Sequence, residues 1–190
     1  MPDFKFGRLT FQALDKSQLS IYVEWMRDPE VTHNLGVPMV PFSVTDEEAW
    51  LESEFKRPID ERTMNMYIQD GDTSCLKLIG NGGFHAIDNK EQSAEIGLFI
   101  ADKTEWNKGY GTEAVQALIW HGFHHLNLHR IWLRVHAPNK GGIRAYEKAG
   151  MKHEGIFREA HYQEGRFVDV LFMSILRQEW DQAQEKEAEA

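Results

Sequence analysis

The stretch WNKGYGTEA, residues 106–114, places two glycines one residue apart, immediately before a segment with helical periodicity. Its GYGTEA portion fits the permissive dinucleotide pattern GxGxxA, so a nicotinamide or flavin site has to be considered first. A Rossmann fingerprint needs a strand directly before the glycines and an acidic residue at the end of the next strand, about 20 positions on. Here DKTEWNK separates Gly109 from the strand that ends near Ala101, and the next strand ends in RVHAPN. Neither condition is met, so the sequence argues against a dinucleotide site.

The same glycine run lacks the GK[ST] ending with which nucleoside triphosphatases hold a terminal phosphate and magnesium. What remains is a loop of successive backbone amides that opens a helix. The partial positive charge at such a helix end can hold a pyrophosphate without a metal. Coenzyme A carries a pyrophosphate of this kind. The two glycines could also form only a turn and a helix start, so the rest of the chain has to decide between these interpretations.

The composition indicates one ordered globular domain. With 190 residues, 42% of them hydrophobic and 27% charged, the chain is long enough for one buried core and short for two. We expect a single domain over residues 1–177 and a polar tail over residues 178–190 that frays. No apolar run approaches the roughly 20 residues of a membrane helix, and the first residues lack the features of a secretory signal. One cysteine, Cys75, permits no internal disulfide, so we expect a cytoplasmic protein with no membrane partner.

The formal net charge of −9 bears on the choice of partners. Sequence-independent binding to nucleic acid depends on lysine and arginine that displace counterions, so this charge argues against a nucleic acid partner. The same acidity would attract a cationic substrate. Many cytoplasmic proteins are acidic without having a cationic partner, so the charge alone does not identify the substrate.

Alternating apolar residues and turn signals predict seven strands, and helical periodicity predicts four helices between them. The strands are expected at residues 4–14, 64–70, 75–87, 93–102, 130–137, 154–162 and 166–176. The helices are expected at residues 16–27, 45–57, 111–126 and 139–150. The TDEE stretch predicts a capping box at the start of the second helix, formed by Thr45 and Glu48.

Two stretches in this order resemble a known family: AEIGLFIADKTEWNKGYGTEA, residues 94–114, and LHRIWLRVHAPNKGGIRAYEKAGMKHEGIFREAHYQEGRFVDV, residues 128–170. They are similar to the GNAT superfamily of acyl-CoA N-acyltransferases, and most of all to its RimJ/RimL-like branch of ribosomal-protein N-terminal alanine acetyltransferases. Trp106 departs from the superfamily loop pattern [QR]xxGx[GA] in a way that is common in this branch. The resemblance implies a GNAT fold, an α/β (α+β) architecture with a mixed, mostly antiparallel seven-stranded sheet flanked by helices and splayed between strands 4 and 5.

The resemblance also implies which residues hold acetyl-CoA, the expected cosubstrate. It places the pantetheine beside Phe99 and Ile100 and the pyrophosphate on the backbone of the glycine loop. The loop residues concerned are Asn107, Lys108, Gly109, Tyr110, Gly111 and Thr112. Asn139 would contact the coenzyme as well, although a helix cap explains this residue equally well.

Acetylation of an amine requires a proton acceptor. An alkyl amine has a pKa near 10.4, so at pH 7 only about one molecule in 2,500 carries a free lone pair. Glu95 is the candidate base, because a partly buried carboxylate can have its pKa raised toward the working pH; a solvent-facing glutamate or a cross-strand pair is the alternative. Tyr146 matches the tyrosine that the family aims at the sulfur as general acid, and a core aromatic is its alternative. Losing Tyr146 should slow turnover rather than abolish it.

His121 and His125 share a predicted helical face at positions i and i+4, which raises the question of a metal site. No cysteine or carboxylate nearby completes a ligand set, and acyl transfer from a thioester requires no metal. We therefore expect no metal.

These observations predict an acetyl-CoA-dependent N-acyltransferase in which a primary amine attacks the thioester directly. The resemblance favours a protein N-terminal amine as acceptor, while polyamines, amino sugars and aminoglycoside-like amines remain open. The acceptor contacts are expected from the loop at residues 33–43, the helix at 45–57 and the hairpin near 157–166. A non-catalytic sensor that binds acyl-CoA is the alternative of another class. Proteins of this family often form dimers, so a homodimer is an open expectation.

Overall fold

The computed structural model describes residues 3–36, 41–69, 71 and 75–188 of the chain. These residues form two compact units, each with its own set of internal contacts. The first unit comprises Met1–Phe84 and Gly97–Ala114, and the second comprises His85–Ile96 and Val115–Ala190. The hairpin of strands β4 (Leu76–Asp88) and β5 (Ser93–Ile100) contributes residues to both units.

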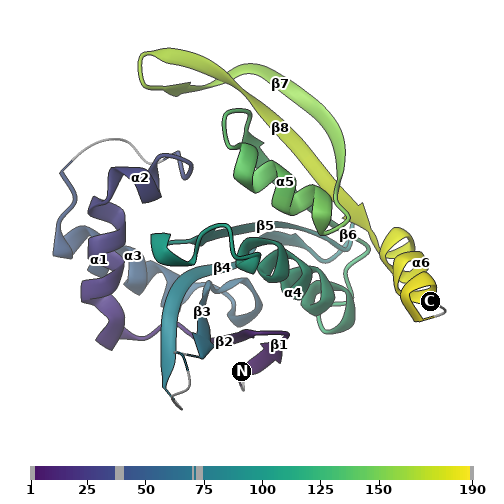
Figure 1. Ribbon diagram of the computed structural model, residues 1–190, viewed down its shortest axis with the longest axis horizontal. Coiled ribbons are helices and arrows are strands. Elements are labelled where there is room, and N and C mark those ends of the chain that lie inside the picture. The colour runs from purple at the N-terminus through teal and green to yellow at the C-terminus, as the bar shows by residue number, and fades with distance from the viewer. Residues whose placement is uncertain (1–2, 37–40, 70, 72–74, 189–190) are drawn as a thin grey trace. The chain divides into compact units, whose positions relative to one another are not determined.

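The first unit contains five strands with short helices packed on them (Figure 1). Its strands are hydrogen-bonded in the order β1 (Phe4–Phe6), β2 (Leu9–Ala13), β3 (Met64–Gln69), β4 and β5. The elements between β2 and β3 are the 3₁₀ turn η1 (Lys16–Gln18), helices α1 (Leu19–Arg27), α2 (Pro29–Thr32) and α3 (Val44–Lys56), and the 3₁₀ turn η2 (Ile59–Glu61). A further 3₁₀ turn, η3 (Lys103–Glu105), follows β5 and leads to the first turn of α4 (Tyr110–His124).

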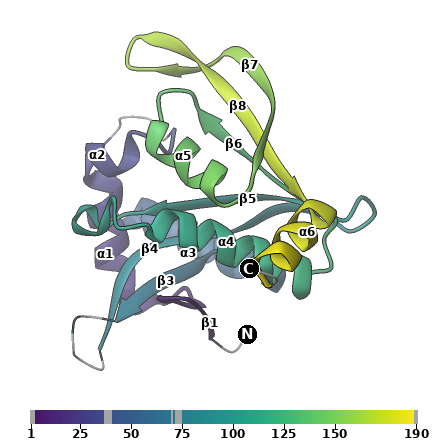
Figure 2. The ribbon, with the colours of Figure 1, turned by 45° about the vertical axis from the view of Figure 1, so that its right-hand side comes forward.

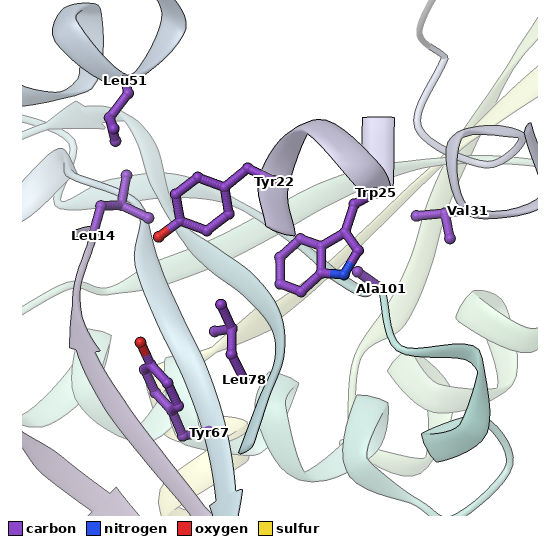
Figure 3. Close-up of a cluster of buried hydrophobic side chains, with 8 residues drawn as sticks. All are labelled: Leu14, Tyr22, Trp25, Val31, Leu51, Tyr67, Leu78 and Ala101. Atoms are coloured by element: carbon purple, nitrogen blue, oxygen red, sulfur yellow. The ribbon is translucent and has the colours of Figure 1, made fainter. Parts of the chain in front are cut away.

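A cluster of eight buried side chains holds the helices of the first unit against its strands (Figure 3). Its members are Leu14, Tyr22, Trp25, Val31, Leu51, Tyr67, Leu78 and Ala101. Tyr22 and Trp25 come from α1 and Leu51 from α3, and the Tyr22 hydroxyl donates to Asn65 Oδ1 at 2.9 Å. Burial of one large apolar side chain contributes about 1.5–3 kcal/mol. The cluster therefore fixes the positions of α1 and α3 on the strands.

The second unit is built around strands β6 (Arg130–His136), β7 (Lys152–Gln163) and β8 (Arg166–Leu176). With the β4–β5 hairpin they are hydrogen-bonded in the order β4, β5, β6, β8 and β7. Strands β5 and β6 run parallel, whereas β6 with β8 and β7 with β8 are antiparallel. Strands β7 and β8 form a long hairpin whose turn lies at the opposite end from helix α6 (Figure 2). Helices α4, α5 (Lys140–Lys148) and α6 (Arg177–Ala188) complete this unit.

A mixed, mostly antiparallel sheet flanked by helices is therefore confirmed, but it has eight strands rather than seven. The difference arises at Gly7, where φ is +54° and the chain turns back on itself, so residues 4–14 form the antiparallel pair β1 and β2 instead of one strand. The rings of Phe4 and Phe11 stack across this pair with centroids 4.5 Å apart. The predicted splay falls between β5 and β6, which pair only at residues 93–95 with 130–132.

The start of α3 also differs from the prediction. The capping box joins Ser43 and Asp46: Ser43 Oγ accepts from the Asp46 amide at 3.2 Å, and Asp46 Oδ2 accepts from the Ser43 amide at 2.8 Å. The expected box of Thr45 and Glu48 is wrong, because the helix already begins at Val44 and Thr45 lies in its first turn.

Residues 178–188 of the expected polar tail belong to helix α6, while residues 189–190 lie outside the described residues. Glu179 accepts from the Leu176 amide at 3.1 Å, which satisfies a backbone donor at the start of the helix. Trp180 packs against Phe123 with ring centroids 5.7 Å apart. These contacts hold the first turn of α6, and the fraying of the chain end stays a prediction. Like the other helices in the described ranges, α6 is not long and apolar enough to cross a membrane.

Candidate active site

The glycine loop of residues 106–112 leads into α4. Asn107 and Gly109 have φ values of +62° and +89°, so the backbone adopts the left-handed conformation twice before the helix begins at Tyr110. The first hydrogen bond of the helix runs from the Glu113 amide to the Gly109 carbonyl at 3.1 Å. The amides before it have no partner within the helix and lie at its positive end. They belong to Tyr110, Gly111 and Thr112. The loop can therefore accept an anionic group.

Two side chains of the loop hold it to the preceding segment. Trp106 Nε1 donates to the Ile100 carbonyl at 2.7 Å, and Lys108 Nζ lies 2.9 Å from Glu105 Oε2. The Trp106 ring thus ties the start of the loop to the end of β5. A hydrogen bond of this kind gives Trp106 a structural reason to stand where the superfamily usually has Gln or Arg.

Arg8, which the sequence analysis did not include in the site, contacts the loop from the turn between β1 and β2. Its guanidinium donates to the Lys108 carbonyl at 3.2 Å and lies 4.2 Å from the centroid of the Tyr110 ring. The same group pairs with the Glu113 carboxylate at 2.7 Å, and the Arg8 amide bonds that carboxylate as well. A glycine followed by a basic residue is a weak turn signal, and no local pattern links it to a loop 100 residues later.

Phe99 and Ile100 form the end of β5, directly before the chain turns toward the glycine loop. Strand β4 lies so close here that a Cβ at Gly80 would collide with the Phe99 carbonyl oxygen. The Phe99 ring packs edge-on against Trp25 with centroids 5.9 Å apart, so it connects β5 with α1. The contact of Phe99 and Ile100 with pantetheine stays a prediction.

A pocket of about 310 Å³ lies in the first unit between α1, α3 and the strands β4 and β5. Its lining comprises Tyr22, Trp25, Met26, Leu35, Phe42, Asp46, Glu47, Trp50, Asn81 and Phe99. Most of these side chains are aromatic or aliphatic, so the walls are apolar with a few polar groups. The loop at 33–43 and the helix at 45–57, two segments predicted to contact the acceptor, both line it. Residues 37–40 of that loop lie outside the described residues, and the third segment, near 157–166, belongs to the second unit.

Glu47 is a buried acid in the wall of this pocket. The residue is 4% exposed, and among the described residues no hydrogen bond or ion pair reaches its carboxylate. Burial raises the pKa of Glu47 to about 7. Its neighbour Asp46 differs, because hydrogen bonds from Ser43 lower the pKa of that carboxyl. The sequence pattern does not single out Glu47, because in TDEE only Glu48 has the spacing from Thr45 that a capping box requires.

The predicted base Glu95 lies on the part of β5 that belongs to the second unit, and Arg134 of β6 holds both of its oxygens. Arg134 Nε donates to Oε1 at 2.7 Å and Nη2 donates to Oε2 at 3.0 Å. A bidentate guanidinium fixes the orientation of the carboxylate. This arrangement corresponds to the cross-strand alternative for Glu95, and the role of Glu95 as base stays a prediction.

Asn139 and Tyr146, the remaining predicted site residues, belong to the α5 segment. Asn139 Oδ1 accepts from the Gly142 amide at 2.9 Å, so Asn139 is the helix cap that its sequence context indicated. A Cβ at Gly142 would come within 2.7 Å of the Asn139 side chain, so glycine is needed there to keep the cap. Burial raises the pKa of Tyr146 to about 12, so the phenol keeps its proton at neutral pH and can donate a hydrogen bond. The contacts of both residues with the coenzyme stay predictions.

His121 and His125 lie side by side on α4 with ring centroids 5.0 Å apart. Burial, followed by the charge of His125, lowers the pKa of His121 to about 4. In the ranges that the structure describes, His, Cys, Asp and Glu side chains form no group of three or more that could hold a metal ion.

A mixed sheet with one parallel strand pair, and between those two strands a helix whose first amides can bind an anion, is the arrangement expected of an acyl-CoA N-acyltransferase. Residues 8–152 match the family described as acetyltransferase (GNAT) domain, and the chain belongs to this family. It is therefore an N-acetyltransferase of the EC 2.3.1 type that uses acetyl-CoA.

Several related proteins align with much of the chain. The uncharacterized N-acetyltransferase YoaA of Bacillus subtilis (strain 168) is 34% identical over 166 residues, covering 87% of this chain and 91% of that protein. The spermidine N(1)-acetyltransferase of Vibrio cholerae serotype O1 is 28% identical over 179 residues, covering 92% and 96%. The protein named "Putative ribosomal N-acetyltransferase YdaF" of Bacillus subtilis is 33% identical over 104 residues, covering 55% and 56%.

A solved structure supports the fold. The crystal structure of a spermidine N-acetyltransferase from Vibrio cholerae, in complex with CoA and spermine, superimposes with a TM-score of 0.78 at 24% identity. The superposition covers 91% of this chain and 98% of that chain. At this identity the likeness establishes the architecture only.

Proposed function

We propose that the acceptor is a small cationic alkyl amine of the polyamine type, and that the pocket between α1 and α3 holds it. The observation that carries this proposal is the buried Glu47 carboxylate in a wall that also contains Tyr22, Trp25 and Trp50. Aromatic rings attract ammonium groups through cation–π contacts, and a carboxylate attracts them by charge. The net charge of −9 adds a general attraction for cations. A neutral or anionic acceptor would gain from none of these features.

The similarity to spermidine N(1)-acetyltransferase supports the same acceptor class. That alignment extends over 92% of this chain and so includes both units. The family match from residue 8 to residue 152 likewise includes residues of both units, and we propose that residues 1–177 form one N-acetyltransferase domain. Cytoplasmic location and homodimer formation stay predictions.

A protein N-terminal amine is the second candidate acceptor. The similarity to YdaF favours it, as does Trp106 at the head of the glycine loop, which is typical of the RimJ/RimL-like branch of ribosomal-protein N-terminal alanine acetyltransferases. An N-terminal amine has a pKa near 8, so it needs less help from a base than an alkyl amine does. A buried carboxylate in the acceptor pocket has less to contribute to such a substrate.

The family resemblance and the geometry of the glycine loop support a proposal for the coenzyme site. We infer that the backbone of residues 107–112 binds the pyrophosphate, that Phe99 and Ile100 contact pantetheine, and that Asn139 contacts the coenzyme besides capping α5. Tyr146 would assist the departing thiolate. Its pKa of about 12 lies well above the thiol value near 8.5, so we expect it to contribute a hydrogen bond rather than complete proton transfer.

The test begins with thermal unfolding in the presence of acetyl-CoA, CoA and NADH separately, because a ligand that binds the native state raises its apparent stability. Thiol release is then followed with spermidine, spermine, peptide amino termini and amino sugars as acceptors. Release that is fastest with spermidine or spermine supports the proposal. Release with peptide amino termini alone favours the second candidate. A stability shift without any thiol release favours a non-catalytic acyl-CoA sensor.

A further inference from the structure

Glu47 is buried in a mostly apolar pocket wall, an environment that is unfavourable for an ionised carboxylate. The cap at Ser43 sets the start of α3, and Glu47 then points into the pocket while Asp46 and Glu48 on either side are exposed. A charge that is buried without a partner destabilises the folded chain. A carboxyl group in a pocket whose titration is strongly shifted by burial is a candidate for a functional group that a ligand completes.

The other polar groups of the pocket are less suited to take up a proton. Tyr22 donates its hydroxyl to Asn65 at 2.9 Å, and burial raises the pKa of Tyr22 to about 12. Asp46 is bound in the helix cap, which lowers the pKa of its carboxyl. Asn81 of β4 is 6% exposed and carries an amide, which can bond to an amine but does not titrate. Among the described lining residues, Glu47 is thus the group whose charge changes near neutral pH.

Phe99 relates this pocket to the expected position of the thioester. It lines the pocket and belongs to the end of β5, along which pantetheine is proposed to lie. An amine in the pocket and the pantetheine arm would therefore share Phe99 as a neighbour. Direct attack requires such proximity between the nitrogen and the thioester carbon.

We propose that Glu47 binds the ammonium group of the acceptor and then takes one of its protons, which makes it the general base in place of Glu95. The inference rests on the proposed function, because it needs an amine as acceptor.

The step balances in protons and electrons. A carboxylate oxygen of Glu47 takes one proton from the ammonium group and leaves a neutral amine with a free lone pair. That lone pair forms a bond to the carbonyl carbon, the carbon–sulfur bond breaks, and its electron pair leaves on the sulfur. A second proton passes from the nitrogen to the sulfur to give the free thiol, and Glu47 returns its proton to water. A carboxyl with a pKa of about 7 is basic enough for the first transfer at neutral pH.

The variant Glu47→Gln tests this role, because it keeps the size of the side chain and removes its basicity. With spermidine as acceptor at pH 7 we expect kcat to fall about 100- to 1,000-fold, while the thermal shift with acetyl-CoA is unchanged. The pH profile is the sharper readout. Between pH 7 and 9 the kcat/KM of the wild type should be nearly constant, because the charged amine reacts through ionised Glu47. The residual kcat/KM of the variant should rise about tenfold per pH unit, because only amine that is already neutral can react.

Glu48→Gln is the matched control, since Glu48 is the exposed neighbour on the same helix, and it should behave as the wild type. Wild-type kcat and an unchanged pH profile in Glu47→Gln would overturn the role of Glu47 and leave the acetyltransferase function intact. A wild type that binds acetyl-CoA but releases no thiol with any amine would instead remove the proposed function and this role with it. If Glu47→Gln does not fold, Glu47→Asp is the alternative variant, because it withdraws the carboxylate by one methylene and keeps its basicity. Its kcat should be lower than that of the wild type, while the pH profile of kcat/KM is retained. An undiminished kcat would contradict the proposal.

Discussion

Arg134 on β6 holds both carboxylate oxygens of Glu95 on β5, at 2.7 and 3.0 Å, across the parallel strand pair of the second unit. This pair joins the strands at the point where the sheet changes from antiparallel to parallel pairing. The two hydrogen bonds hold the carboxylate in a fixed orientation against a partner on the neighbouring strand. Glu95 therefore has a structural role, the pairing of β5 with β6 through Arg134, that does not depend on catalysis.

We expect Glu95→Gln to reduce kcat less than tenfold. The free energy of unfolding should fall by no more than about 1 kcal/mol, because the Arg134 side chain is 56% exposed and solvent screens the pair. Steady-state kinetics and urea unfolding measure the two effects. Arg134→Gln is the control and should show the same small changes. A loss of 100-fold or more in the Glu95 variant alone would restore Glu95 as the base.

The buried Glu47 makes the stability of the protein depend on pH. Burial raises the folded-state pKa of Glu47 to about 7, above the unfolded value near 4.5, so its contribution is most favourable below pH 4.5 and is lost as the pH rises through 7. Glu47→Gln should therefore be more stable than the wild type at pH 8, by up to about 3 kcal/mol, with no such advantage near pH 4.5. Urea unfolding at both pH values measures the difference. A variant that is less stable than the wild type at pH 8 would show that Glu47 has a stabilising partner.

His121 has the opposite dependence. Burial first, and the charge of His125 second, lower its folded-state pKa from 6.5 to about 4, so its contribution to stability is present above pH 6.5 and is lost as the pH falls toward 4. The group should account for up to about 3 kcal/mol of the acid destabilisation of the wild type. His121→Gln should reduce that pH dependence, whereas His129→Gln, which changes an exposed histidine of the same unit, should preserve it. Thermal unfolding between pH 4 and 7 compares the three proteins, and parallel curves for all of them would contradict the assignment.

Trp106→Phe removes the hydrogen bond from Nε1 to the Ile100 carbonyl and retains an aromatic ring. One such bond contributes about 0.5–1.5 kcal/mol. Without it, part of the free energy of CoA binding has to order the glycine loop, so the Kd for CoA should rise about three- to tenfold. Calorimetric titration with CoA measures this change. Trp180→Phe, a substitution on α6, is the control and should leave the Kd unaltered. Equal affinities in Trp106→Phe and the wild type would mean that the bond does not position the loop.

Tyr146→Phe should lower kcat about tenfold and leave the thermal shift with acetyl-CoA unchanged. The reason is that a phenol with a pKa near 12 stabilises a departing thiolate by hydrogen bonding, which supplies a modest part of the rate. A complete loss of turnover with the coenzyme still bound would indicate an essential acid. Unaltered kcat would leave Tyr146 as a core aromatic, which was its alternative interpretation.

The strands and the glycine loop could be predicted because their signals are local. Strand β6 was expected at residues 130–137 and extends from Arg130 to His136, and α4 begins within one residue of the expected position. The fold predictions that were wrong concern segments whose local sequence pattern is compatible with two structures. The alternation at residues 4–14 is the same for one strand as for a hairpin, and only the turn at Gly7 distinguishes them.

The site was less predictable than the fold, because burial and long-range contacts decide it. Nothing within TDEE distinguishes the buried Glu47 from the exposed Glu48. The difference depends on which face of α3 packs inward, and Glu47 shares that face with the buried Leu51. The contact of Arg8 with Lys108 likewise depends on the packing of segments that are remote in sequence. Glu95 was chosen for its place on a strand, and only the position of Arg134 reveals its partner.

The contact between Arg8 and the glycine loop makes the amino-terminal hairpin part of the surroundings of the proposed coenzyme site. An affinity tag fused ahead of β1, or a protease that trims this hairpin, would act on coenzyme binding although the affected residues are 100 positions away from the loop. Preparations that differ only at the amino terminus should therefore be compared by their affinity for CoA before their activities are compared.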